Sequence, residues 1–107
     1  MLELNETDRN IQAIDFCKEF IASKSKYRYV FGINEYADCI ASAIEVSGFI
    51  DDFTSEKSHL GKSIVKLLDV PKNALVVSAL LGRPVTGQRL LSDAGLRHID
   101  FFSFYRY

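Results

Sequence analysis

The chain has 107 residues, of which 48% are hydrophobic and 25% are charged. This length suffices for one domain with a hydrophobic core and is short for two. The formal net charge is -1 and both signs are mixed along the chain, so the basic surface on which nucleic-acid binding depends is missing. We therefore expect a single globular domain that binds no nucleic acid.

The N-terminal residues MLELNETDRN carry acidic side chains where a secretory signal has basic ones, and no apolar stretch precedes a cleavage site. No segment approaches the length needed to span a bilayer. Cys17 and Cys39 belong to no CxxC pair and are expected to be reduced thiols inside helices, buried in the core. These features predict a soluble, cytoplasmic protein without membrane insertion.

Residues 1–25 are predicted to form an N-terminal helix, because apolar side chains recur with near-helical spacing through NIQAIDFCKEFIAS after the capping residues Thr7 and Asp8. YRYVF, residues 27–31, is rich in aromatic and β-branched side chains, as strands are. A second helix is expected after this strand, with Asn34 as its N-cap and Gly48 as its terminator.

The second half of the chain continues the alternation of strands and helices. An almost unbroken apolar run suits a strand that is covered on both faces, as in a parallel sheet. We expect, in chain order, a short strand GFIDDF, a polar loop TSEKSHLGKS, about one helical turn in IVKLLDV, the buried strand ALVVSALL (74–81), a helix between Pro84 and Gly95, and a final strand HIDFFSFYRY.

Strands separated by helices imply right-handed crossovers and a parallel sheet with helices on both faces. The expected fold class is therefore α/β: a small Rossmann-like, three-layer domain with a parallel sheet of about four strands. We expect one domain over residues 1–107, in which 1–25 form the additional N-terminal helix and 26–107 form the α/β core.

In an open parallel sheet, ligands bind beyond the carboxyl ends of the strands, where the strand order reverses. Three loops of this chain are expected at that edge, and they make the candidate ligand-binding site. Its residues are Gly32, Ile33 and Asn34 after the first strand, Asp51 and Asp52 after the second, and Gly82 and Arg83 after the buried strand.

The turn after the first strand contains Gly32 alone where a dinucleotide-binding turn has three glycines. Ile33 and Asn34 occupy the turn, and Glu35 adds a carboxylate at the helix start, which favours the helix dipole but repels a phosphate. Two interpretations stay open, a structural turn and a remaining ligand contact. Tight pyrophosphate binding is disfavoured in either case.

Asp51 follows Gly32 by about 20 residues, the interval at which a Rossmann acid contacts a ribose hydroxyl. A turn-forming role is the alternative, because aspartates after strands often accept hydrogen bonds from loop amides. Asp51 and Asp52 are expected to point to opposite faces, and no third ligand is visible, so no metal site is predicted. Arg83 is either a phosphate or carboxylate ligand or a solvent-exposed side chain.

No catalytic residue is predicted, because the sequence has no GxSxG, HExxH or GxxxxGK[ST] motif. Neither His59 nor His98 has a serine or cysteine motif near it. Whether the chain belongs to an enzyme therefore stays open at this point. The C-terminal FFSFYRY holds five aromatic side chains, and as a final strand it would leave an apolar edge that a partner covers.

YVFGINEYADCIA, GFIDDFTSE, GKSIVKLLDVPKNALVVSALLGRPVTGQRLL and DFFSFYRY together resemble the segment that precedes the catalytic domain in bacterial FkbM-type methyltransferases, which are associated with surface-glycan synthesis. The resemblance covers roughly residues 27–107 and rests on the overall similarity of these stretches, not on an invariant catalytic motif. The strand, glycine turn and later DD also look like the N-terminal domain of PglD-type sugar acetyltransferases, which contacts a nucleotide-sugar and whose turn is richer in glycine.

The methyltransferase resemblance implies a non-catalytic accessory domain that positions substrate or mediates assembly. It places S-adenosylmethionine only in a downstream or partner domain and implies no cofactor in this chain. The implied partners are a catalytic methyltransferase domain or a second copy joined through the C-terminal aromatic segment. The alternative is a domain that binds a nucleotide or nucleotide-sugar, and an independent nicotinamide-dependent dehydrogenase is a remote third possibility.

Overall fold

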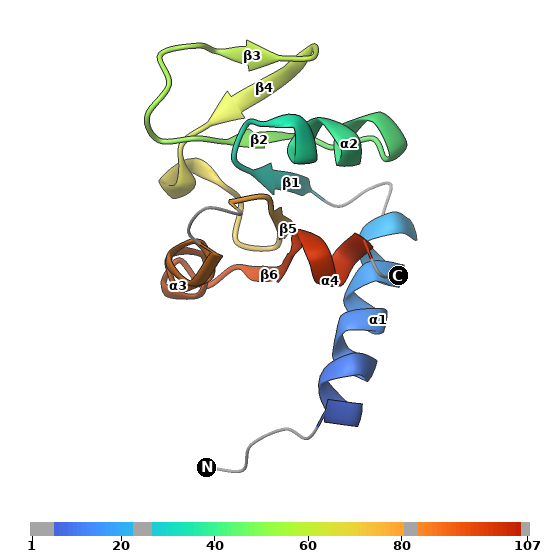
Figure 1. The fold of residues 1–107 in the computed structure, drawn as a ribbon. Coiled ribbons are helices and arrows are strands. Elements are labelled where there is room, and N and C mark those ends of the chain that lie inside the picture. Colours follow the sequence, from blue (N-terminus) through green and yellow to red (C-terminus); the bar gives the residue numbers. More distant parts are fainter. Residues whose placement is uncertain (1–5, 23–26, 81–83, 106–107) are drawn as a thin grey trace.

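The computed structural model describes the backbone of residues 6–22, 27–80 and 84–105 (Figure 1). These residues form an α/β fold, as the alternation of patterns predicts. The elements are α1 (Glu6–Ala22), β1 (Arg28–Phe31), α2 (Glu35–Ala43), β2 (Gly48–Ile50), β3 (Ser58–His59), β4 (Lys62–Val65), the 3₁₀ turn η1 (Leu67–Asp69), β5 (Leu75–Ser78), α3 (Pro84–Asp93), β6 (Arg97–Asp100) and α4 (Phe101–Tyr105).

The sheet of the described residues has six strands in the order β3-β4-β2-β1-β5-β6, where about four strands were expected. β4, β2, β1, β5 and β6 run parallel, and β3 is antiparallel to β4. The chain moves outward from β1 to β2 and β4, then returns to the other side of β1 with β5 and β6. The strand order therefore reverses between β1 and β5.

The additional strands come from residues predicted as a polar loop and as the start of a helical turn, and that prediction is wrong for residues 58–59 and 62–65. Leu60 and Gly61 have φ values of 51° and 74°, the left-handed pair that a two-residue hairpin turn requires, and they join β3 to β4. Ile64 and Val65 pair with β2 instead of forming a helix. The helical turn is confined to η1, because tertiary pairing overrides the local apolar spacing.

Two hydrophobic clusters lie on opposite faces of the sheet, so helices cover both faces. Along β1, Val30 belongs to the cluster with α1, α2 and α4, whereas Tyr29 and Phe31 belong to the cluster with α3. This alternation follows from the two-residue period of a strand. All four residues of β1 and all four of β5 are buried, as expected for central strands of a parallel sheet.

α1 begins at Glu6, so Thr7 and Asp8 lie within the helix and the predicted cap is wrong. The helix buries Phe16, Cys17 and Phe20, but two apolar residues of the predicted periodic stretch are substantially exposed, Ile14 at 41% and Ile21 at 45%. The predicted burial of Cys39 is wrong, because this thiol of α2 is exposed. The buried guanidinium of Arg28 binds its C-terminal end: Nη1 donates to the Phe20 and Ile21 carbonyls at 3.0 and 3.3 Å. Arg28 thus satisfies carbonyls that lack partners within the helix.

The C-terminal aromatic segment is a helix after Asp100, not the continuous strand that was predicted. Asp100 Oδ2 accepts a hydrogen bond from the Ser103 amide at 3.1 Å, as an N-cap does. Phe101 packs edge-to-face on Tyr36 of α2, with ring centroids 5.1 Å apart, and Phe104 packs likewise on Phe20 of α1 at 5.2 Å. The chain itself covers these two aromatic side chains.

Two glycines were predicted to end helices, and one prediction is wrong. α2 ends at Ala43, and Gly48 is the first residue of β2. Gly95, with φ 74°, does close α3: its amide donates to the Ser92 carbonyl at 3.0 Å, and the Leu96 amide donates to the Leu91 carbonyl at 3.0 Å. This pair of bonds is the Schellman motif.

His98 should make the stability of the fold depend on pH. Its Nε2 lies 2.9 Å from Ser92 Oγ, and its buried Nδ1 has no hydrogen-bond partner among the described residues. Burial lowers the pKa of His98 below its ordinary 6.5. Because the unfolded chain then takes up a proton at higher pH than the folded chain, the free energy of unfolding should fall as the pH drops below about 6.5.

Urea denaturation of the natural chain and of His98→Gln at pH 7.5 and pH 5.0 tests this dependence, with the chain dilute. The natural chain should lose more stability than the variant between these two pH values. An equal loss in both proteins would show that His98 does not contribute to the pH dependence.

Candidate functional site

The carboxyl edge of β1, β2 and β5 is the candidate site, because the strand order reverses there. The structure brings together the turn after β1 and the loop after β2, since these strands are neighbours. The residues that directly follow β5, Ala79 and Leu80, complete the described part of this edge. Gly82 and Arg83, predicted as ligand contacts, lie outside the described residues.

Asn34 joins the two strands between which the order reverses. Its Nδ2 donates a hydrogen bond of 2.9 Å to the Ala79 carbonyl at the end of β5. Its Oδ1 accepts one of 2.9 Å from the Ala37 amide and so caps α2, as predicted from the sequence. Both ends of the side-chain amide are therefore used to hold the turn after β1 against β5.

Gly32 allows the chain to turn beneath Leu80. Its φ is 107°, and a Cβ atom at this position would lie 2.8 Å from Leu80 Cδ2. The Gly32 amide donates to the Ile50 carbonyl at 2.9 Å. In a dinucleotide site the glycine gives the pyrophosphate a close approach to the backbone. Here the close approach is made by a leucine side chain.

The remaining residues of this turn also favour a structural role. Ile33 is partly buried and packs against the core cluster on the α2 face. Glu35 and Asp38 place two carboxylates in the first turn of α2. Carboxylates there stabilise the helix through its dipole and oppose the binding of a phosphate at the same amides.

Asp51 shapes the loop after β2. Its Oδ1 accepts hydrogen bonds from the amides of Phe53 and Thr54, at 2.8 and 3.0 Å. This is the turn-forming role that was one of the two interpretations of Asp51, and the aspartate lies half-buried at the edge of the sheet.

Asp52 joins the loop after β2 to the segment after β4. Its Oδ1 accepts from the Leu67 amide at 2.8 Å, which fixes the start of η1. Lys66 Nζ donates to the carbonyls of Asp52 and Thr54, at 2.9 and 3.3 Å. The sequence analysis missed Lys66, and no local signal identifies it, because its role depends on β4 lying beside β2.

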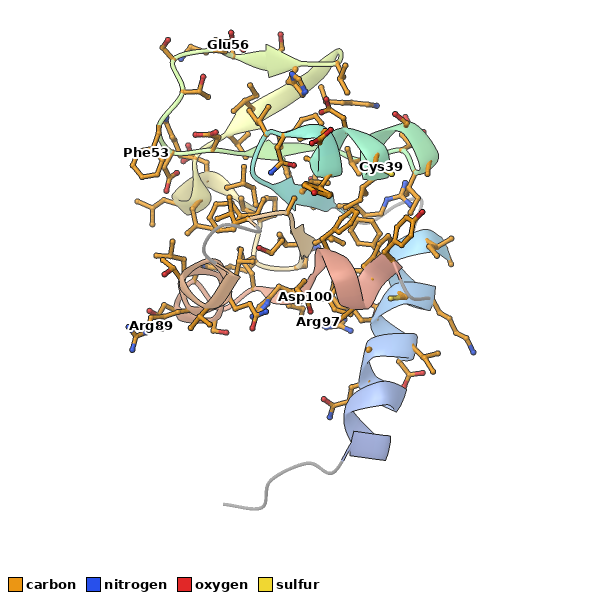
Figure 2. The ribbon with its side chains drawn as sticks, viewed as in Figure 1. Cys39, Phe53, Glu56, Arg89, Arg97 and Asp100 are labelled. Carbon is orange, nitrogen blue, oxygen red and sulfur yellow. The ribbon has the colours of Figure 1, made fainter. Side chains whose placement is uncertain are left out.

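The loop after β2 and the segment after β4 each expose an apolar side chain. Phe53 is 97% exposed and Leu68 is 95% exposed, and we call these two residues the Phe53 surface. Figure 2 shows Phe53 directed away from the body of the protein at the end of the loop after β2. Contiguous exposed apolar patches mark surfaces that contact another molecule, whereas single exposed apolar side chains are common on monomers.

A pair formed by a histidine and an aspartate lies outside this edge. His59 Nε2 is 2.7 Å from Asp38 Oδ1, and the imidazole packs edge-to-face on Phe49 with centroids 5.0 Å apart. Asp38 is in α2 and His59 is in β3, so the pair fastens the hairpin to the helix.

Among the described residues, the groups with shifted pKa values lie outside the turn after β1 and the loop after β2. Burial raises the pKa of the Cys17 thiol and of the Tyr29 phenol. The hydrogen bond to Glu19 raises the pKa of Arg97. No cluster of three or more metal-ligating side chains occurs in the part of the chain that the structure describes. The edge therefore offers hydrogen-bonded turns and exposed apolar side chains.

Comparison of the chain with protein-family models, with curated proteins and with solved structures finds no match. None of the described helices is long and apolar enough to cross a membrane.

Replacing Asp51 tests the loop directly. Asp51→Ala removes the acceptor of two amide hydrogen bonds and should lower the free energy of unfolding by about 1 to 2 kcal/mol. Asp51→Asn keeps an Oδ1 acceptor and should lose less than half of that amount. Urea denaturation of both variants measures the difference. Equal losses would mean that the carboxylate charge, not the turn geometry, is what the loop requires.

Proposed function

We propose that this chain is a non-catalytic accessory domain of Rossmann-like fold that works with an S-adenosylmethionine-dependent, FkbM-type methyltransferase of bacterial surface-glycan biosynthesis. It positions the substrate or assembles the complex, while S-adenosylmethionine binds in the downstream or partner domain. The observation that carries the non-catalytic role is the bridge from Asn34 to the Ala79 carbonyl across the switch point.

The strand order supports the Rossmann-like part of the proposal. The five parallel strands, counted along the chain, lie in the order 3-2-1-4-5, which is the order of a Rossmann sheet without its last strand. β3 adds an antiparallel strand at one edge.

The uses of the polar side chains support a non-catalytic role. Asn34, Asp51 and Asp52 hold turns, and Lys66 binds two carbonyls of the neighbouring loop. A general acid or base needs a proton-transferring group within reach of a substrate. These four side chains of the described part of the edge instead fix the backbone.

The Phe53 surface is the proposed contact with the methyltransferase domain. In the C-terminal aromatic segment, the contact expected from the sequence, Tyr105 is 70% exposed, whereas Phe101 is buried within the chain and Phe104 is packed on Phe20. Phe53 and Leu68 are instead almost fully exposed on loops that Asp52 and Lys66 fasten together. A preformed apolar contact limits the entropy lost on association.

Sedimentation velocity of the chain mixed with an FkbM-type catalytic domain tests the proposal. We expect a complex that Phe53→Ser weakens by about tenfold, since a buried aromatic anchor contributes 1 to 2 kcal/mol or more. Leu60→Asn is the matched control: Leu60 is 57% exposed in the β3–β4 turn, at the other end of β4 from Leu68. No complex, or equal weakening by both variants, would contradict the proposal.

The alternative proposal is a domain that binds a nucleotide or nucleotide-sugar. Asp51 favours it, because this carboxylate follows β2 beside β1, where the ribose-binding acid of a Rossmann domain lies. In that case Asp51→Asn should weaken nucleotide binding while leaving most of the stability intact. Under the accessory proposal the chain binds no nucleotide, so Asp51→Asn has no nucleotide binding to change.

A further inference from the structure

β6 forms one edge of the sheet, opposite β3. A groove of about 770 Å³ runs along it, between α1 and α3, and every residue from Leu96 to Asp100 lines this groove. Figure 2 shows Arg97 and Asp100 near one another beside α4 and α1, and Figure 1 shows the N-terminal turns of α1 extending past this edge. No described strand pairs with the outer side of β6, and the groove leaves space beside it.

The backbone groups of β6 that face the groove follow from the alternation of the sheet. The amides of Leu75 and Ala79 donate to the carbonyls of Tyr27, just before β1, and of Phe31, at its end, so the odd-numbered residues of β5 face β1. The even-numbered residues of β5 therefore face β6. In the observed parallel register, with Val76 beside His98, these residues bond to the odd-numbered residues of β6. The amide and carbonyl of His98 consequently face away from the sheet.

The positions on either side of His98 each offer one group. The Leu96 amide already donates to the Leu91 carbonyl, so Leu96 contributes its carbonyl. The Asp100 carbonyl starts α4, where an N-cap carbonyl accepts the first helical bond, so Asp100 contributes its amide. Along the edge, β6 therefore presents the Leu96 carbonyl as an acceptor, the carbonyl and amide of His98 as an acceptor and a donor, and the Asp100 amide as a donor.

This sequence of donors and acceptors is complementary to itself when the strand is reversed. We propose that two copies of this chain pair antiparallel through β6, about a two-fold axis at His98. The His98 backbone groups of the two copies then bond to each other, and each Asp100 amide donates to the Leu96 carbonyl of the second copy. Opposite residues, such as Arg97 and Ile99, lie on the same face of the joined sheet, as a two-fold axis normal to the sheet requires.

The side chains of the edge do not oppose such pairing. Arg97 is paired with Glu19 of its own chain at 2.7 Å and would lie opposite Ile99 of the second copy, so no like charges face each other across the two strands. The edge carries no proline and no lysine, the residues that protect exposed strands from such pairing. The pairing leaves the Phe53 surface free, so it does not depend on the proposed function.

Amide hydrogen exchange on the natural chain tests the pairing residue by residue. At high concentration the amides of His98 and Asp100 should exchange about tenfold more slowly than in a dilute sample, in parallel with dimer formation in sedimentation equilibrium. The Ile99 amide faces β5 and is the internal control: its exchange should stay slow in both samples. A chain that stays monomeric, or unchanged exchange at His98 and Asp100 in a dimer, would overturn the proposal.

Two variants at His98 separate the backbone from the side chain. His98→Pro removes the outward amide, and proline is tolerated on an edge strand where the amide faces solvent. His98→Ala keeps the amide and removes the imidazole. We expect the proline variant to be monomeric and the alanine variant to dimerise like the natural chain. A folded proline variant that still dimerises would place the interface elsewhere; if this variant does not fold, the exchange experiment decides.

Discussion

Asn34→Ala should lower the free energy of unfolding by about 2 to 3 kcal/mol. The substitution removes the N-cap of α2, which contributes about 1 kcal/mol. It also removes the donor to the Ala79 carbonyl, and a partly buried carbonyl without a partner costs about 1 to 2 kcal/mol more. Equilibrium urea denaturation, followed by circular dichroism, measures the loss.

Asn34→Ser is the matched control for this prediction. Serine keeps a capping oxygen for the Ala37 amide but does not reach the Ala79 carbonyl. The variant should therefore recover about 1 kcal/mol of the loss in the alanine variant. If both variants were as stable as the natural chain, Asn34 would not be what holds the turn after β1 to β5.

Gly48→Ala should lower the free energy of unfolding by about 3 kcal/mol, because overpacking at a position without space forces the backbone to move. A Cβ atom on Gly48 would lie 2.5 Å from the Ser63 carbonyl oxygen of β4 and 3.2 Å from Tyr29 Cε1. The backbone of the neighbouring strand cannot move aside as a flexible side chain can. The pairing of β2 with β4 depends on this glycine.

Gly61→Ala provides the comparison within the same sheet. Gly61 has a left-handed φ of 74° but no atom within 4 Å of an added Cβ, so only conformational strain of about 1 to 2 kcal/mol is expected. Thermal and urea unfolding of the two variants should therefore rank Gly48→Ala as the less stable. The reverse ranking would contradict the tight approach of β2 to β4.

Local signals predicted the elements whose chemistry lies within a few residues. The aromatic and β-branched run of β1, the apolar run of β5, the Asn34 cap and the Gly95 terminator all act over such distances, and the structure confirms each. The α/β class follows from their order.

Contacts between distant segments decided the parts that were predicted incorrectly. Residues 58–65 form a hairpin because β4 pairs with β2, a fact that no local pattern contains. The aromatic run after Asp100 has the composition of a strand but becomes a helix, because its side chains pack on Phe20 and Tyr36. Tertiary packing overrides propensity in both places.

At the candidate site, too, some features follow from local sequence and others only from contacts between distant segments. The single glycine and the carboxylate at Glu35 already disfavoured pyrophosphate binding from the sequence. The Leu80 side chain over Gly32 and the bond from Asn34 to Ala79 join residues more than 40 positions apart, so only the fold reveals them. They are also the observations on which the accessory role depends.

The most direct test of the central claim is a titration of the isotope-labelled chain with a nucleotide-sugar, with S-adenosylmethionine and with a nicotinamide dinucleotide. Because Asn34 bonds to Ala79 across the switch point and Leu80 lies close to Gly32, we expect no saturable NMR shift at the Gly32 amide or the Asn34 side-chain amide, and no change in melting temperature. A saturable shift at both groups, with stabilisation near the 2.7 kcal/mol expected at about a hundred times the dissociation constant, would contradict the account.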